Sequence, residues 1–134
     1  MELQPYIFFY GRCEEALEFY KSALGGTYEL MRVKDSPMAE HMPPNTANLV
    51  MHASFTADGV KFLASDGREI KAIDPDAGNI DLALTATDAA QGERAFNALA
   101  EGGKVMMPID KAFWGGRFGM LVDRFGIEWM MTLP

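Results

Sequence analysis

One histidine stands where an imidazole could contact a ligand or move a proton. His52 lies in the middle of LVMHASF, a segment typical of a β-strand. Side chains alternate along a strand, so His52 is expected to share a face with Val50 and Ser54. On the wall of a cavity, an imidazole can donate or accept a proton near neutral pH. The alternative is a structural histidine bonded to a neighbouring strand or loop, and the sequence leaves both open.

Cys13 is the one thiol of the chain, so no internal disulfide can form. It precedes Glu14 and Glu15 at the predicted start of a helix. The helix dipole there lowers a thiol pKa, whereas the two carboxylates raise it. No partner motif accompanies this cysteine, so a buried residue of the first helical turn is the alternative to a catalytic thiol.

Glu128 is a carboxylate in a predicted strand, two residues after Gly126. By alternation it shares a face with Met130. A carboxylate at the rim of a cavity would polarise a ligand, and a solvated strand end is the alternative. Lys61 holds the corresponding place two residues after Gly59.

Two large aromatic residues occupy a predicted loop. Phe113 and Trp114 precede Gly115 and Gly116, which let a loop bend. Exposed aromatic rings leave much apolar surface in water, so we expect them to cover something. The alternatives are a cleft, which Trp114 would cap, and a subunit interface. Trp129, in a predicted strand, is expected instead to face a helix and stay rigid.

The elements that carry these residues follow a pattern that occurs twice in the chain. CEEALEFYKSALGG and DAAQGERAFNALAEGG have the apolar spacing of helices and end in paired glycines, and an offset of 77 residues aligns Phe19 with Phe96. Predicted strands precede and follow each helix. The paired strands MHASFTADGVKFLAS and FGMLVDRFGIEWMMTLP match at an offset of 67, with turns at Asp58-Gly59 and Phe125-Gly126.

Each half therefore reads β-α-β-β-β. We predict an α+β fold of two tandem modules, at about 1–70 and 78–134, within one domain of residues 1–134. One such module cannot bury both faces of its sheet, so we expect two curved sheets around a shared cleft, with the helices outside. A cleft of this kind is a ready site for a small molecule.

Composition excludes several classes of partner. The formal charge is −7 and no run of Lys or Arg offsets it, which argues against nucleic acid and anionic membranes. No apolar run approaches the roughly 20 residues that span a bilayer, and the N-terminal segment has no basic region of a signal peptide. We expect a cytoplasmic protein.

Four segments resemble the PhnB-like branch of the vicinal oxygen chelate superfamily, which includes glyoxalase I, extradiol dioxygenases and bleomycin-resistance proteins. They are PYIFFYGRCEEALEFYKSALGG, MHASFTADGVKFLASD, EGGKVMMPIDKAFWGGRFG and DRFGIEWMMTLP, and together they cover nearly the whole chain. The resemblance implies a homodimer, often with the cleft completed across subunits. Some members carry a 3-demethylubiquinone methyltransferase label, but no Gly-rich loop between strand and helix offers a nucleotide site here.

The superfamily's usual chemistry requires a divalent metal bound by the first and last strands of each half. For the last strands the resemblance places the ligands four residues past the turn glycine, at Leu63 and Met130, and neither side chain suits a hard cation. We therefore expect neither a metal nor another cofactor. On the first strands the positions fall at Gln4 or Pro5 and at Asp81 or Leu82.

The sequence thus favours a small-molecule-binding protein of the glyoxalase and bleomycin-resistance type without a bound metal. The alternative is a metal-dependent lyase, isomerase or dioxygenase-type enzyme whose ligands lie elsewhere, and whether any reaction is catalysed is left open. The expected partners are a small apolar or aromatic molecule and a second copy of the chain. The expected ligand-binding residues are Ile7, Phe9, His52, Leu63, Trp114, Glu128 and Met130.

Overall fold

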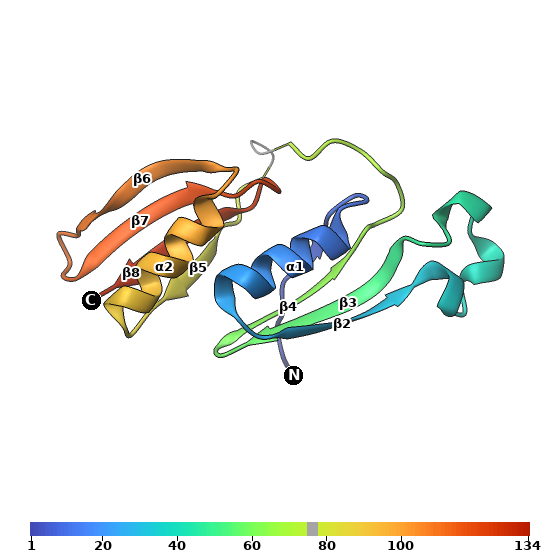
Figure 1. Cartoon of the computed structure of the whole chain (residues 1–134), viewed down its shortest axis with the longest axis horizontal. Helices are drawn as coiled ribbons and strands as arrows, with labels where there is room; N and C mark the ends of the chain where they lie inside the picture. Colours follow the sequence, from blue (N-terminus) through green and yellow to red (C-terminus); the bar gives the residue numbers. More distant parts are fainter. Residues whose placement is uncertain (75–77) are drawn as a thin grey trace. The chain divides into compact units, whose positions relative to one another are not determined.

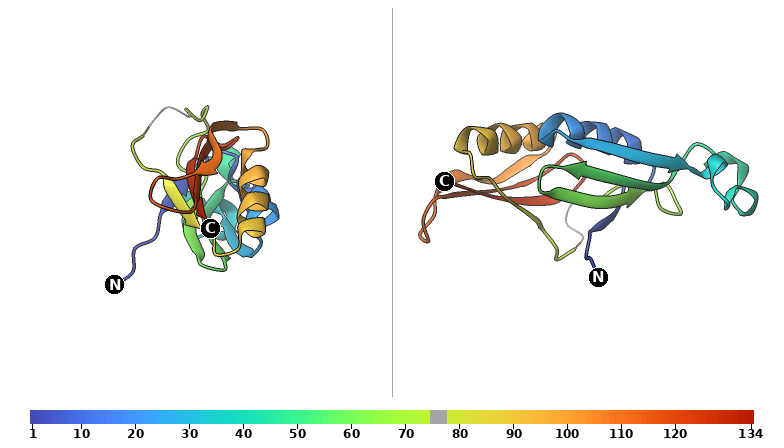
Figure 2. Two further views of the ribbon diagram at one scale, coloured as in Figure 1. Left: turned by 90° about the vertical axis from the view of Figure 1, so that its left-hand side faces the viewer. Right: turned by 90° about the horizontal axis from the view of Figure 1, so that it is seen from below.

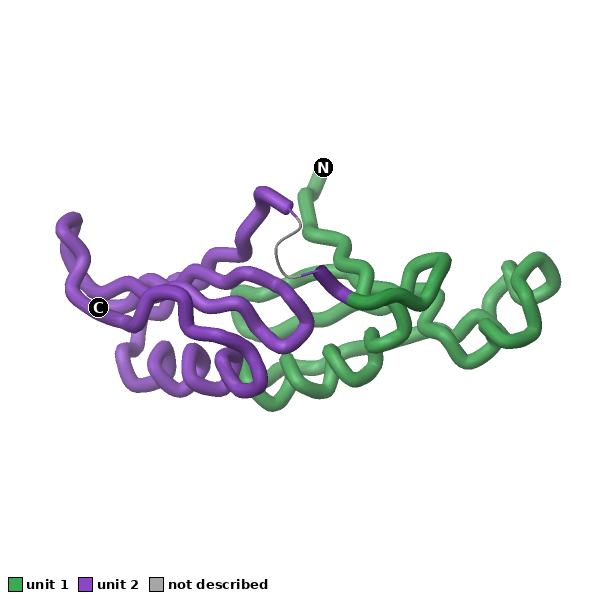
Figure 3. The backbone as a smooth tube through the Cα atoms, turned by 90° about the horizontal axis from the view of Figure 1, so that it is seen from above, with its two compact units in different colours: residues 1–72 green, residues 73–134 purple. Residues whose placement is uncertain are grey.

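A computed structural model describes residues 1–74 and 78–134 of the chain (Figure 1). These residues form two compact units, Met1–Ala72 and Ile73–Pro134 (Figure 3). Each unit contains one α-helix and one four-stranded sheet in the order β-α-β-β-β along the chain. The predicted α+β class and the repeated module are therefore confirmed, and each unit is described by itself below.

Unit 1 has a mixed sheet with the strand order β1-β4-β3-β2. The edge strand β1 runs parallel to β4, and the other neighbours are antiparallel. Three short 3-10 turns, at 33–35, 39–41 and 44–46, connect β2 to β3. The regular elements are β1 (Tyr6–Phe8), α1 (Cys13–Leu24), β2 (Thr27–Arg32), β3 (Val50–Ala57) and β4 (Val60–Ser65).

The apolar stripe of α1 forms the core of unit 1 with the inner face of the sheet. Tyr20 is fully buried, and its ring lies edge-on to Phe62 at 5.7 Å between centroids. Phe62 in turn stacks on Phe55 at 4.9 Å. Because successive strand residues point to opposite faces, these inner positions fix which residues of β3 and β4 face away from the helix.

Unit 2 repeats the arrangement with the strand order β5-β8-β7-β6. Its edge strand β5 is parallel to β8, and the remaining pairs are antiparallel. Phe96 and Leu99 of the helix are buried with Leu121 and Trp129 of the sheet. The elements are β5 (Leu82–Thr85), α2 (Ala89–Ala100), β6 (Lys104–Lys111), β7 (Arg117–Val122) and β8 (Glu128–Leu133).

Strand pairing supports the repeat residue by residue. Tyr6 lies opposite Leu63 in unit 1, and Ala83 lies opposite Met130 in unit 2, so the offsets of 77 and 67 residues align the same pairs. The turn glycines also correspond, because Gly59 and the glycine at 126 both adopt the left-handed region, with φ of 75° and 81°.

The two turns differ in length. Ala57 pairs with Val60, so the first turn has the two residues predicted for Asp58-Gly59. Val122 pairs with Glu128, so the second connection runs through residues 123–127. The longer connection is held by Asp123, whose backbone N–H donates to the carbonyl of Ile127 at 2.9 Å.

The expected match of Phe19 with Phe96 is wrong by one residue. α1 begins at Cys13 and α2 at Ala89, an offset of 76, so Tyr20 takes the buried place that Phe96 has in unit 2. Phe19 is only half-buried.

The glycine pairs that follow the helices nevertheless correspond. A Cβ on Gly26 would lie 2.2 Å from the carbonyl oxygen of Thr56, and one on Gly103 would lie 2.2 Å from that of Val122. Both glycines are therefore required by a close backbone approach to the neighbouring strand. The helices begin 76 residues apart but the glycines lie 77 apart, so unit 2 has one additional residue between them. This residue is at the end of α2, where Glu101 occupies the C-cap position that Gly25 has in α1.

In each unit the helix covers one face of its own sheet (Figure 2). We call the opposite surface of each sheet its helix-free face. The shared cleft predicted between the two sheets stays a prediction. Among the residues that the structure describes, no helix has the length and apolar character needed to cross a bilayer.

Candidate functional site

The helix-free face of unit 1 carries a hydrogen-bonded tyrosine–histidine pair. The phenol oxygen of Tyr6 lies 3.1 Å from Nδ1 of His52, and their ring centroids are 5.7 Å apart. The Phe8 ring is 5.3 Å from that of Tyr6. Tyr6 is 42% exposed and Phe8 49% exposed, so the pair stands in an accessible aromatic surface rather than in the core.

β4 lies between the strands that carry the pair, and Leu63 forms the floor there. Leu63 pairs with Tyr6 on one side and with Ser54 on the other, and paired residues share a face of the sheet. The structure therefore brings two predicted site residues, His52 and Leu63, onto one surface. We name the surface formed by Tyr6, Phe8, His52 and Leu63 the Tyr–His face.

Two predicted site residues lie on the other side of this sheet. Phe9 is fully buried, and its ring centroid is 6.0 Å from that of Tyr20 in α1. Ile7 pairs with the buried Ala64 and is half-buried. Since a fully buried ring contacts a ligand only if the core opens, Phe9 does not line the accessible face, and Tyr6 and Phe8 take the positions expected for Ile7 and Phe9.

The helix-free face of unit 2 is crossed by a row of methionines. Met120 pairs with Met107 on one side and with Met130 on the other, and Met130 pairs with Ala83. Thioether side chains adapt to irregular apolar shapes. Glu128 is half-buried on the same face of β8, two residues from Met130. The structure thus places both predicted residues of this strand on the helix-free face.

Trp129 points the other way, as predicted. It is 3% exposed, and its indole Nε1 donates to Oδ2 of Asp123 at 2.9 Å. Asp123 also accepts from the backbone N–H groups of Phe125 at 2.8 Å and Ile127 at 3.0 Å. This carboxylate therefore fixes both the connection between β7 and β8 and the indole.

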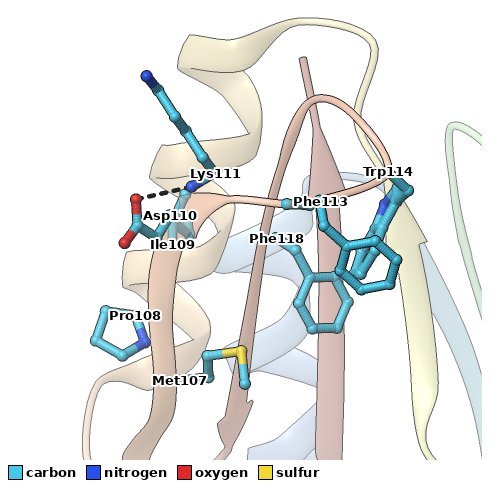
Figure 4. A pocket seen from close by; sticks show the side chains of 9 residues that line it. Met107, Pro108, Ile109, Asp110, Lys111, Phe113, Trp114 and Phe118 are labelled. Atoms are coloured by element: carbon cyan, nitrogen blue, oxygen red, sulfur yellow. Dashed lines mark hydrogen bonds between the residues drawn. The ribbon is translucent and has the colours of Figure 1, made fainter.

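A pocket of about 480 Å³ lies beside the aromatic loop of unit 2 (Figure 4). The Trp114 ring is edge-on to Phe118 at 5.3 Å and to Phe113 at 4.7 Å, and Trp114 remains 55% exposed. Met107 and Phe118 belong to the helix-free face by their strand pairing. The lining residues are Met107, Pro108, Ile109, Asp110, Lys111, Ala112, Phe113, Trp114 and Phe118.

The loop that carries Trp114 is a tight turn between β6 and β7. Its glycines both have positive φ, 103° at Gly115 and 69° at Gly116. The Ala112 N–H donates to the carbonyl of Gly116 at 3.0 Å, and the Gly115 N–H donates to that of Ala112 at 3.1 Å. The glycines therefore close the turn, as the sequence predicted, and the turn carries two aromatic rings that line the pocket.

Comparison with known proteins identifies the family. The sequence profile of the 3-demethylubiquinone-9 3-methyltransferase family matches residues 1–132. The chain belongs to this family. Among curated proteins it is 29% identical to protein YjdN of Escherichia coli over 144 residues, which cover 99% of this chain and 95% of YjdN.

Solved structures share the fold of this chain. This PhnB-like protein is 36% identical to protein PA1353 of Pseudomonas aeruginosa, with a TM-score of 0.84 and coverage of 99% and 97% of the two chains. A putative 3-demethylubiquinone-9 3-methyltransferase, PhnB protein, from Bacillus cereus is 25% identical over the full length of both chains, with a TM-score of 0.73. A glyoxalase/bleomycin resistance protein/dioxygenase superfamily member from Sphaerobacter thermophilus shares the fold, at 19% identity, a TM-score of 0.58 and coverage of 100% and 98%.

The positions that the resemblance assigns to metal ligands have no set of hard donors in this PhnB-like protein. Strand pairing puts Tyr6 beside Leu63 and Ala83 beside Met130, rather than any of the four first-strand candidates. Within residues 1–74 and 78–134, no three His, Cys, Asp or Glu side chains gather where they could hold a metal ion. The absence of a metal in solution stays a prediction.

The thiol of Cys13 is unsuited to catalysis. The side chain is fully buried, and burial raises the pKa of the thiol, with the carboxylates of Asp66 and Glu14 adding to the effect. A protonated thiol is a poor nucleophile. Of the alternatives left open by the sequence, the geometry favours a buried residue of the first helical turn.

A buried carboxylate that the sequence did not single out holds this end of α1. Asp66 is 3% exposed, and its Oδ1 accepts the backbone N–H groups of Gly11 at 3.0 Å and Cys13 at 2.8 Å. Its Oδ2 accepts the N–H of Val50 at 2.7 Å. The segment ASDG is typical of a turn, and nothing in it indicates this role, because the partners are backbone N–H groups 16 to 55 residues away in the sequence.

Proposed function

We propose that this PhnB-like protein binds a small apolar or aromatic molecule and does so without a metal ion. The observation that carries the proposal is the pocket beside Trp114, Phe118 and Met107. Concave apolar surfaces with a few polar groups are typical of small-molecule sites, and Asp110 and Lys111 supply the polar groups here. The row of methionines next to the pocket suits ligands of irregular shape.

The proposed contacts follow from exposure and strand register. In unit 2 they are Trp114, Met130 and Glu128. In unit 1 they are His52 and Leu63, with Tyr6 and Phe8 in place of Ile7 and Phe9 because the former pair is exposed and the latter lies on the helix side.

The experiment uses the two tryptophans as separate reporters. A protein with Trp129→Phe retains only Trp114, and one with Trp114→Phe retains only Trp129. Titration with apolar and aromatic small molecules is expected to change the fluorescence of the Trp114-only protein and to leave that of the Trp129-only protein unchanged. Trp114→Ala should weaken binding by roughly 1–3 kcal/mol, the usual size of a buried aromatic contact. A response confined to Trp129 would contradict the proposed site.

The alternative function is a metal-dependent lyase, isomerase or dioxygenase-type enzyme, which the structural likeness to the glyoxalase group favours. Metal content separates the two. We expect well under one metal ion per chain after purification without chelator and dialysis against divalent ions. Leu63 and Met130 offer no hard ligand, and their partners on the first strand of each unit are Tyr6 and Ala83. Elemental analysis that finds one tightly held ion per chain would favour the enzyme.

We propose that the protein is a homodimer. β6 is an edge strand of its sheet, and Val105 and Met106 on it are largely exposed. Open edges with exposed apolar residues favour association, and closed twofold dimers are the commonest form that it takes. Phe113, at 97% exposed, adds apolar surface nearby. Sedimentation at micromolar concentration should give the mass of a dimer, and a monomer mass throughout would refute the proposal.

A further inference from the structure

We propose that the Tyr–His face recognises a planar aromatic molecule that carries a carbonyl or carboxylate group. The ring of the ligand would lie on the exposed aromatic side chains, and its oxygen would accept a hydrogen bond from Nε2 of His52. This inference rests on the proposed small-molecule function and adds to it the chemical class of the ligand and a polar recognition group.

The hydrogen bond between Tyr6 and His52 fixes which nitrogen carries the proton. A phenol is a stronger acid than a neutral imidazole N–H, so Tyr6 donates and Nδ1 of His52 accepts across the 3.1 Å contact. The proton of the neutral ring is then on Nε2. In the part of the chain that the structure describes, no protein acceptor is found for this N–H. The pair therefore presents one oriented donor to solvent, and such a donor selects ligands with an acceptor.

The surface next to this donor is aromatic and accessible. The rings of Tyr6, Phe8 and Tyr10 follow one another at centroid distances of 5.3 and 6.4 Å, with interplanar angles of 38° and 28°. Phe8 and Tyr6 are each close to half exposed. Aromatic rings stack on such surfaces in offset or edge-on geometry, which gives affinity for a planar ligand beyond the apolar area that it covers.

Charge does not decide between an anionic and a neutral acceptor here. Lys61 lies on the same face of β4 as Leu63, but it is close to Glu2, at 3.9 Å between Nζ and Oε1. Lys71 lies over the Tyr10 ring at 4.4 Å. Glu29 pairs with Ser54 across the sheet, on the same helix-free face. Since both signs of charge are present, the shared requirement is a hydrogen-bond acceptor, and the test compares an amide with a carboxylate.

The test measures dissociation constants of 2-naphthamide, 2-naphthoate and naphthalene for the full chain and its variants. His52→Phe keeps an aromatic ring but removes the donor. It should weaken binding of the two acceptor-bearing ligands about fivefold to tenfold, and that of naphthalene by less than about twofold. Tyr6→Phe keeps the aromatic ring but removes the phenol that fixes the proton on Nε2 of His52. We therefore expect a smaller loss of affinity, again for the two acceptor-bearing ligands and not for naphthalene. Since both residues are exposed, an unchanged melting temperature confirms that the variants fold.

A spectroscopic signal makes the test independent of affinity. The chain has two histidines, so His41→Gln leaves the His52 imidazole as the only one, and its ring nitrogens can be followed by NMR. Naphthamide should shift the Nε2 resonance and naphthalene should not. His41→Gln alone should bind all three ligands like the unchanged protein, because His41 lies in the 3-10 turn of residues 39–41.

The outcomes separate this inference from the proposed function. Equal losses for all three ligands in His52→Phe, no loss for any, or no binding of the acceptor-bearing ligands at all would overturn the inference. Loss of binding in Trp114→Ala without an effect of His52→Phe would also overturn it and would leave the pocket beside Trp114 as the site. If His52→Phe weakened binding of only the two acceptor-bearing ligands while the fluorescence of Trp114 did not change, the result would support the inference and would contradict the pocket beside Trp114 as the site.

Discussion

Asp66→Ala is expected to lower the free energy of unfolding by about 3–5 kcal/mol. The carboxylate is buried and accepts three backbone N–H groups, from Gly11, Cys13 and Val50, at 2.7 to 3.0 Å. Alanine leaves these donors in the core without an acceptor, and each buried unsatisfied group costs on the order of 1–3 kcal/mol. The substitution also removes a buried negative charge beside the N-terminus of α1, where Glu14 and Glu15 of the first turn remain.

The matched control is Asp88→Ala in α2. Asp88 caps its own helix and accepts from the N–H groups of Ala90 at 2.9 Å and Gln91 at 3.4 Å, but it is exposed, so water replaces it. We expect a loss of about 1 kcal/mol there, the usual size of an N-cap contribution. Urea denaturation followed by circular dichroism measures both variants. Equal losses would show that the buried position of Asp66 adds nothing to its role as a cap.

Trp129→Ala should destabilise the protein by about 3–5 kcal/mol. The substitution empties a large volume in the core of unit 2, and large-to-small changes of buried aromatic residues have this size. It also removes the indole N–H that Asp123 accepts at 2.9 Å. Trp129→Phe, which keeps most of the volume, should lose considerably less.

Trp114→Ala tests the same side chain in an exposed position. Trp114 is more than half exposed and contacts mainly the rings of Phe113 and Phe118, so a loss within about 1 kcal/mol is expected. Denaturation of both alanine variants under identical conditions gives the comparison. Comparable losses would mean that Trp114 is covered in the protein in solution, and a change in sedimentation of the Trp114→Ala variant would then assign it to the subunit interface.

The repeated β-α-β-β-β order, the turn glycines and the inward orientation of Trp129 could be predicted because each depends on local pattern or backbone conformation. Which side chains of β1 face the helix could not be predicted. In PYIFFY nearly every position is apolar, so alternation does not show that Phe9 faces the helix and Phe8 does not. Pairing of Tyr6 with Leu63 settles which side chains face the helix, and strand pairing is not a local property of the sequence.

The same difference between local pattern and long-range contact applies to the site residues. Leu63 and Met130 lie on helix-free faces, and buried neighbours alternate with them along β4 and β8. His52 is exposed, but Val50, which was expected to share its face, is buried, so alternation does not hold at the start of β3. That these residues contact a ligand stays a prediction. Tyr6, the partner of His52, was missed because it is 46 residues away in the sequence. The role of Asp66 could not be predicted for a similar reason, because its carboxylate accepts main-chain N–H groups, which any residue supplies.

The parallel pairing at the edge of each sheet sets the order in which a growing chain can complete its units. In the sheet, β1 pairs only with β4. The backbone N–H groups of Gly11 and Cys13, at the start of α1, donate to the carboxylate of Asp66, which lies 55 and 53 residues later in the chain. Within unit 1, the strand that is synthesised first is therefore the last to join the sheet. The same holds for β5, which needs β8. A nascent unit consequently exposes the apolar side of its unfinished sheet until its last strand emerges, and this is the stage at which chaperone binding or misassociation would act.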